Sequence, residues 1–83
     1  MENEKIIGEL IEMFSSVNED PSFDYSKINE ETLIFDDLGL NSIGVMYISL
    51  SIEEKYGFTI SNEMMSNIKT VGDLVNLILN NKK

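Results

Sequence analysis

The chain has 83 residues and a formal net charge of −9, from fifteen acidic residues and six lysines. It contains no cysteine and no histidine, which excludes disulfides, cysteine nucleophiles, thiolate zinc sites and the usual general base. Its acidity disfavours binding to nucleic acids and anionic lipids, and no apolar run reaches the ~20 residues of a membrane span. With no signal-peptide character at its N-terminus, we expect one cytoplasmic, monomeric domain over residues 1–83 that carries, binds or regulates.

The first part of the chain predicts a helix followed by a long loop. Apolar residues at helical spacing favour a helix over 4–17, which ends before Pro21. Its apolar stripe is Ile7, Leu10, Ile11 and Phe14, widened by Ile6, Met13 and Val17. Residues 18–37 lack a long period, so we expect a loop with a short helical turn over 30–33. The loop's expected anchors to the core are Phe23, Tyr25, Ile28, Leu33, Ile34 and Phe35.

The second part predicts three helices with short connections. One helix is expected over 42–56, ending at Gly57, and a short one from Ser61 to about 67. Thr70 and Asp73 form a capping-box pattern before the last helix, and a polar tail follows from residue 80. The last helix has the apolar stripe Val71, Leu74, Val75 and Ile78, extended by Leu77. The predicted fold class is therefore all-α: a small four-helix bundle with a long first loop.

The helix over 42–56 has two opposed apolar faces when its residues are placed at about 100° intervals. One face contains Ile43, Met46, Tyr47 and Leu50. The other contains Val45, Ile48, Ile52 and Tyr56. Such a helix is either covered on both sides or leaves one apolar strip exposed for contact, and periodicity alone favours neither.

The segment from Asp36 to Ile43 contains the candidate site, because Ser42 lies where a glycine turn meets a helix start. Serine is a preferred helix N-cap, so the simpler interpretation gives Ser42 only that role. The functional interpretation is an exposed hydroxyl that carries a phosphate ester, favoured by the free N–H groups and positive dipole end of the helix.

The whole chain resembles the acyl carrier proteins, four-helix carriers that bear 4′-phosphopantetheine. Residues 37–43, Asp-Leu-Gly-Leu-Asn-Ser-Ile, are similar to the family's Asp-Leu-Gly-x-Asp-Ser-Leu attachment motif. The resemblance continues through Ile-Glu-Glu-Lys-Tyr-Gly at 52–57, Ile60, and Ile-Lys-Thr-Val-Gly-Asp-Leu at 68–74. It therefore covers nearly the whole chain.

By this resemblance, Ser42 is modified from coenzyme A by a phosphopantetheinyl transferase, with Asp37, Gly39 and Asn41 completing the attachment motif. The thiol of the arm would hold acyl groups as thioesters, which supplies sulfur chemistry to a chain without cysteine. The implied partners are this transferase and the enzymes that load and process the cargo, in fatty-acid, lipid or polyketide-type synthesis. The bundle interior would offer shelter to an acyl chain.

Three positions depart from the family pattern: Asn41 replaces the usual Asp, Gly44 an Asp of many carriers, and Tyr47 a Glu. The helix is uncharged from Ser42 to Ile52, and only Glu53 and Glu54 match the family's acids. We therefore predict a partner face bound mainly by apolar contact, with Val45, Ile48, Ile52 and Tyr56 in the core. Its residues are Ile43, Met46, Tyr47 and Leu50, with Glu53 and Glu54 at its end.

Other functions stay open at this stage. The cargo could be an amino acid, as in D-alanyl or nonribosomal peptide carriers, since a Ser-x-Gly start occurs among them. The protein could also be an interaction domain with the same fold that is never modified, and Asn41 is the feature that raises this alternative. An enzyme using Asp36 and Asp37 is the weakest option, because adjacent side chains do not converge easily on one point. We predict no catalytic or metal site, and interpret the acids Glu19, Asp20 and Asp24 as solvated.

Overall fold

The computed structural model describes residues 2–17 and 23–82. In chain order these form α1 (Glu2–Val17), the short 3-10 helix η1 (Tyr25–Lys27), α2 (Ser42–Tyr56), α3 (Asn62–Ser66) and α4 (Val71–Asn81). This arrangement confirms the predicted all-α fold class, with three longer helices, a short one and a long first loop. Within the described ranges, no helix is both long and apolar enough to cross a membrane.

Most predicted helix bounds are close to the observed ones, and the differences are local. α1 begins at Glu2 rather than residue 4, and α4 continues to Asn81, so the polar tail begins later than predicted. The predicted helical turn over 30–33 is wrong: the short helix is η1, where the Asp24 side chain caps the start by accepting from the Ser26 N–H. Pro21, expected to end the first helix, lies outside the described residues.

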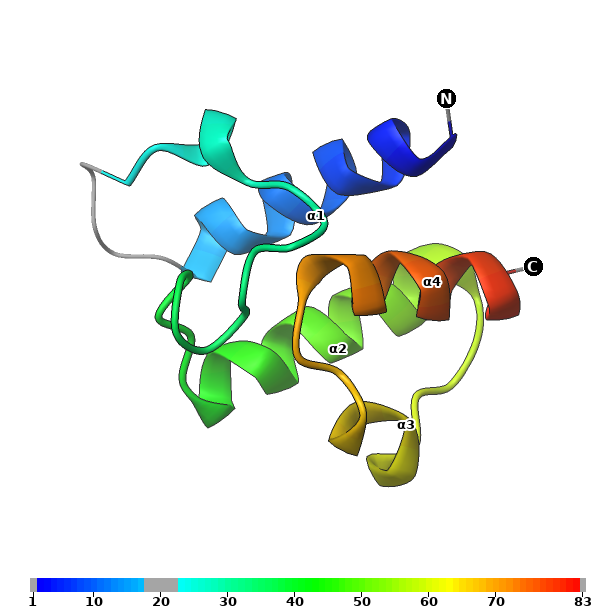
Figure 1. Ribbon diagram of the computed structural model, residues 1–83. Coiled ribbons are helices and arrows are strands. Elements are labelled where there is room, and N and C mark those ends of the chain that lie inside the picture. Colours follow the sequence, from blue (N-terminus) through cyan, green and yellow to red (C-terminus); the bar gives the residue numbers. More distant parts are fainter. Residues whose placement is uncertain (1, 18–22, 83) are drawn as a thin grey trace.

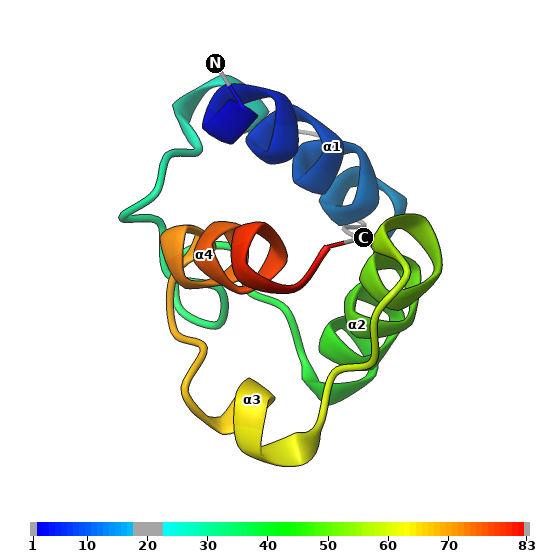
Figure 2. The same cartoon turned by 90° about the vertical axis from the view of Figure 1, so that its right-hand side faces the viewer.

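Three helices surround the core, and the short one lies at its edge. α1 packs against both α2 and α4, and α3 lies apart from α1 at the opposite side of the molecule (Figures 1 and 2). The buried apolar residues come from α1, the loop before α2, α2 itself and α4. They are Ile6, Leu10, Phe14, Ile34, Leu38, Leu40, Ile48, Ile52, Val71, Leu74, Val75 and Ile78.

α1 presents a narrower face to the core than its sequence suggests. The buried residues are Ile6, Leu10 and Phe14, spaced four residues apart on one side of the helix. Ile7 and Ile11, expected in the central stripe, are only half-buried. The centre of the buried stripe is thus shifted from the predicted one toward Ile6.

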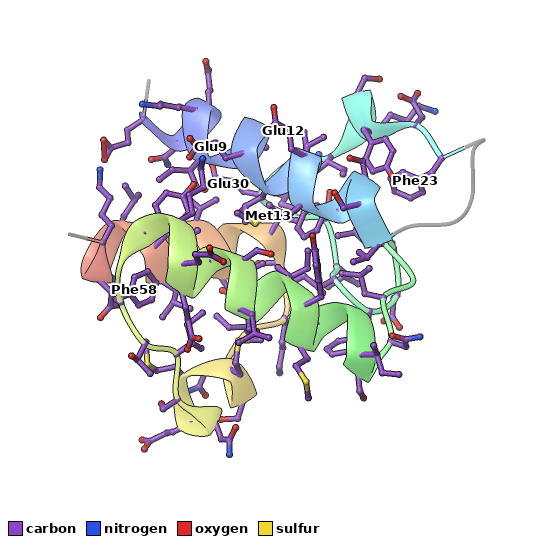
Figure 3. All side chains as sticks on the ribbon, turned by 180° about the vertical axis from the view of Figure 1, so that it is seen from behind. Glu9, Glu12, Met13, Phe23, Glu30 and Phe58 are labelled. Carbon is purple, nitrogen blue, oxygen red and sulfur yellow. The ribbon has the colours of Figure 1, made fainter. Side chains whose placement is uncertain are left out.

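Polar contacts fix α1 to the end of α2. The Tyr56 hydroxyl donates a hydrogen bond to Glu9, and Lys55 Nζ lies 3.6 Å from the same carboxylate. Glu9 lies on α1 beside these last turns of α2 (Figure 3). Burial, together with the neighbouring Glu9 carboxylate, raises the pKa of Tyr56 above its ordinary value of 10. The hydrogen bond and the ion pair therefore both join α1 to the last turn of α2.

Candidate functional site

Ser42 is the first residue of α2, and it is exposed. The N-cap is Asn41, whose side-chain oxygen accepts a 2.8 Å hydrogen bond from the Gly44 N–H. Its backbone oxygen accepts the first helical bond, from the Val45 N–H at 2.9 Å. The simpler interpretation of Ser42 as the helix cap is therefore wrong. The Ser42 hydroxyl is left without a capping role, and the neutral amide of Asn41 caps the helix instead.

The turn before Asn41 is shaped by Asp37 and Gly39. The Asp37 carboxylate accepts a 2.8 Å hydrogen bond from the Leu33 N–H, and the Asp37 N–H donates in return to the Leu33 oxygen at 3.0 Å. Gly39 has φ +67°, a left-handed conformation that favours glycine. Leu38 and Leu40, on either side of Gly39, are buried. The two predicted motif residues therefore set the path of the chain toward Ser42.

The same loop is fixed to the start of α4. The Ile34 N–H donates to the Lys69 oxygen at 3.0 Å, and the Val71 N–H donates to the Thr32 oxygen at 2.9 Å. Ile34 is buried as predicted, whereas Leu33 and Phe35 are exposed, so the expectation that both anchor the loop in the core is wrong. The position of Ser42 thus depends on the loop over 30–41 and, through it, on α4 (Figure 1).

The start of α2 can receive an anionic group. Among the described residues, no hydrogen-bond acceptor faces the N–H of Ser42 or Ile43. These open donors and the positive end of the helix dipole favour a phosphate ester on the adjacent hydroxyl. The residues present therefore fit the predicted attachment of a phosphodiester at Ser42.

The outward side of α2 carries an exposed apolar strip. We call its four residues the outer strip. Their exposed fractions are 78% for Ile43, 64% for Met46, 47% for Tyr47 and 58% for Leu50. On the opposite side, Ile48 and Ile52 are buried, and Val45 and Tyr56 are half-buried against the core. Of the two arrangements left open by periodicity, the structure has the exposed strip rather than a helix covered on both sides.

The two acids at the end of this helix differ. Glu54 is exposed. Glu53 is half-buried, and its carboxylate accepts a 2.7 Å hydrogen bond from the Ile60 N–H in the connection between α2 and α3. Glu53 therefore holds that connection in place, which sequence reasoning did not anticipate.

A surface groove of about 320 Å³ begins at Ser42 and runs between α2 and α3; we call it the site groove. Its α2 wall includes Ser42, Met46, Ser49 and Glu53. These residues recur at intervals of four, three and four, which is helical spacing along a mixed face of α2 that overlaps the outer strip at Met46. Sequence reasoning missed Ser49, and this spacing was the signal that would have found it.

A second hollow, of about 290 Å³, lies between α1, the loop, α2, α3 and α4; we call it the core cavity. Its lining is mainly apolar and includes Phe14, Leu40, Ile48 and Leu74. An apolar cavity of about 150 Å³ holds a benzene molecule. The core cavity therefore has room for an acyl chain of several carbon atoms.

The described residues offer little catalytic equipment. Within them, no group of three or more acidic side chains is placed to hold a metal ion. Asp36 is exposed, and Asp37 uses its carboxylate to fix the turn. Of the acids interpreted as solvated, Asp24 caps η1, and Glu19 and Asp20 lie outside the described residues.

Comparison with known proteins gives consistent matches. A family model described as "Phosphopantetheine attachment site" matches residues 9–78. The chain is 37% identical over 78 residues to an acyl carrier protein of Arthrobacter sp. (strain FB24), covering 94% of this chain and 93% of that protein. It is similar to the crystal structure of an acyl carrier protein from Thermotoga maritima, with 28% identity and a TM-score of 0.78, and the match covers 96% of this chain and 89% of that chain. For a structure of an acyl carrier protein from Enterococcus faecalis, the sequence identity is 29% and the TM-score is 0.77, and the match covers 99% of this chain and 100% of that chain.

Proposed function

Because the chain belongs to the acyl carrier protein family, we propose that Ser42 is its attachment point for 4′-phosphopantetheine. Members of this family are carriers rather than enzymes, and their covalently attached cofactor supplies the thiol that forms thioesters. The observation that supports attachment at Ser42 most strongly is that this residue is exposed and its hydroxyl does not cap the helix, because Asn41 is the N-cap. A transferase reaches this hydroxyl without unfolding the helix start.

The cargo that fits best is an acyl chain, in fatty-acid, lipid or polyketide-type synthesis. The support is the core cavity, whose apolar lining would favour burying methylene groups at about 0.8 kcal/mol each. An amino acid would place a charged ammonium against the same apolar lining, at a high desolvation cost. We therefore favour acyl over aminoacyl cargo. The predicted monomer and cytoplasmic location stay predictions.

We assign the outer strip to partner enzymes, starting with the transferase. The strip begins at Ile43, directly after Ser42, so an enzyme that acts on the hydroxyl must approach this apolar surface. No charged residue lies on α2 before Glu53, so apolar contact dominates the part of this surface nearest the site. Docking should accordingly depend less on ionic strength than the docking of a carrier with an acidic helix.

Mass spectrometry tests the attachment. The unmodified chain is incubated with coenzyme A and a broad-specificity phosphopantetheinyl transferase, as wild type, Ser42→Ala and Ser49→Ala. Ser49 is the matched control because it lies on the same face of α2 within the site groove. We expect the phosphopantetheine mass gain in wild type and Ser49→Ala and none in Ser42→Ala. A gain in Ser42→Ala, or none in wild type with several transferases, contradicts the proposal and, in the second case, favours an unmodified interaction domain.

A second assay tests the outer strip with charge substitutions. Met46→Asp and Tyr47→Glu should each lower the kcat/KM of the transferase, because they place a charge on a surface that must be desolvated. Asn76→Asp adds the same kind of charge at an exposed position of α4 and serves as the control. Equal kcat/KM values for all three variants would show that the outer strip does not take part in docking of the transferase.

A further inference from the structure

The site groove and the core cavity share part of their lining. Val45 from α2 and Asn62 and Met65 from α3 border both hollows. The groove begins at Ser42, and the cavity reaches the buried side chains of Phe14 and Leu74. The two hollows therefore adjoin at these three residues, beside which a chain tethered at Ser42 would pass from the groove to the cavity.

Met65 is the shared residue best able to move. Val45 is β-branched and lies in the first turns of the 15-residue helix α2, so its side chain is stiff. Asn62 is exposed at the start of α3. Met65 is half-buried in a helix of five residues, and its unbranched thioether has three rotatable side-chain bonds.

A weak polar contact joins Met65 to the opposite wall of the groove. The Ser49 hydroxyl, which donates to the Val45 backbone oxygen at 2.9 Å, also lies 3.5 Å from the Met65 sulfur. Because sulfur is a weak acceptor and Ser49 keeps its bond to Val45, losing this contact costs little. The Met65 side chain thus bridges α2 and α3 in a position from which it is easily displaced.

We propose that Met65 is a gate between the site groove and the core cavity, and that it sets the chain length above which tethered cargo is sheltered. The proposal rests on attachment at Ser42. A short chain remains in the groove, because burying few methylene groups does not offset moving Met65. Moving a side chain off its preferred rotamer costs about what burying one or two methylene groups gains. Removing the gate should therefore lower the threshold length by about one to two carbon atoms.

The experiment compares loaded carriers of increasing chain length. Wild type, Met65→Ala, Met65→Leu and Met64→Ala are converted to straight-chain acyl thioesters from acetyl to decanoyl in steps of one carbon atom, and loading at Ser42 is verified by mass. Carbon-13 methyl signals of the methionines and the rate of thioester hydrolysis are then measured. Met64 is the matched control, since it is adjacent and half-buried but lines neither hollow.

In wild type, we expect the Met65 methyl signal to move, and hydrolysis to slow, only from a threshold length upward. Met65→Ala should reach protection one to two carbons earlier, whereas Met65→Leu and Met64→Ala should follow wild type. The same threshold in Met65→Ala as in wild type overturns the gate. So does protection of wild type without any change in the Met65 signal.

A free apolar probe tests the gate even if nothing attaches at Ser42. 1-Octanol titrated into the unmodified chain should shift the Met65 methyl signal, and should bind Met65→Ala several-fold more tightly than wild type or Met64→Ala. Equal binding by all three overturns the gate. Absence of a mass gain at Ser42 would overturn the attachment alone, so the two failures are distinguishable.

Discussion

The loop over 30–41 leads into α2 and also forms hydrogen bonds to the start of α4. The two helix starts differ in how many of their first backbone N–H groups have a hydrogen-bond partner, and we call the start of α4 closed and the start of α2 open. At α4, the Thr70 hydroxyl accepts from the Asp73 N–H at 3.1 Å, and the Asp73 carboxylate accepts from the Thr70 N–H at 3.1 Å and the Lys69 N–H at 2.9 Å. The loop supplies backbone oxygens to the next two donors, from Val71 and Gly72. Every early N–H of this helix therefore has a partner.

At α2, only the side chain of Asn41 caps the helix, through the Gly44 N–H. Ser42 is exposed, and no acceptor faces the N–H groups of Ser42 and Ile43 within the described parts of the chain. Unsatisfied donors are acceptable here because the site is open to solvent. A helix start that only stabilises the fold therefore differs from one suited to an anionic ligand in a simple way. In the first, the protein itself supplies acceptors to all of the first backbone N–H groups, and in the second it leaves some of them unpaired.

Gly44, the third residue of α2, and Gly72, the second residue of α4, offer the test with the largest expected change in stability. A Cβ on Gly72 would lie 2.8 Å from the Glu30 backbone oxygen, whereas one on Gly44 would meet Asn41 and Leu40 atoms at 3.5 Å, an ordinary contact. We expect Gly72→Ala to lower the free energy of unfolding by about 1–3 kcal/mol. Gly44→Ala should leave it unchanged or raise it by up to about 1 kcal/mol, from helix propensity. Denaturant unfolding of both variants measures the difference, and equal losses would show that the open start is packed as tightly as the closed one.

The hydroxyl residues give the next largest effect. Thr70→Ala removes a cap and should cost about 1 kcal/mol of unfolding free energy. Ser42→Ala removes a hydroxyl that caps nothing, and should change stability by less than about 0.5 kcal/mol. The measurement is again denaturant unfolding, with circular dichroism of both variants as the check on folding. A loss at Ser42 as large as that at Thr70 would mean that its hydroxyl has a structural role.

Asn41 tests what charge does at the open start. Asn41→Asp keeps a side-chain oxygen for the Gly44 N–H and adds a negative charge at the positive end of α2. It should raise the free energy of unfolding by about 0.3–1 kcal/mol at low ionic strength. It should also raise the rate of modification by the transferase, because it restores the charge that the family motif places before the serine. Asn41→Ala is the control, and should lose about 1 kcal/mol of capping. An unchanged or slower modification of Asn41→Asp would contradict the expectation that a negative charge before the serine favours the transferase reaction.

Sequence alone predicted the helices well, because their signals are local. The capping pattern at Thr70 and Asp73, the glycine at 57 and the apolar stripe of α4 each depend on neighbours a few residues away. The cap at the site also has a local signal, yet Asn41 and Ser42 are both good caps, and only the backbone path through Gly39 decides between them. That path depends on hydrogen bonds to the distant start of α4.

Long-range packing explains the remaining differences. The exposure of Leu33 and Phe35, the rotated stripe of α1 and the contact between Ser49 and Met65 all depend on which elements meet in space. The two faces of α2 are equally apolar in sequence, and only the positions of α1 and α4 decide which one is buried. Hydrophobic periodicity therefore identifies candidate faces but does not assign them to the core.

Acid titration gives the smallest and most specific test of the two starts. Hydrogen bonds from the backbone N–H groups of Lys69 and Thr70 hold the pKa of Asp73 below its ordinary value. A carboxylate with a lowered pKa in the folded state adds stability above its unfolded pKa of ~3.9, and this stability is lost as the pH falls through the folded pKa. Asp73→Asn should therefore be less stable than wild type at neutral pH, by less than the ~1 kcal/mol expected for Thr70→Ala because this carboxylate is near the surface. The gap should narrow as the pH falls below about 4, whereas Asn41, which does not titrate, gives α2 no such dependence. Unfolding free energies of wild type and Asp73→Asn between pH 7 and pH 3 measure this. A gap as large at pH 3 as at pH 7 would mean that the hydrogen-bond geometry of Asp73, rather than its charge, stabilises the start of α4.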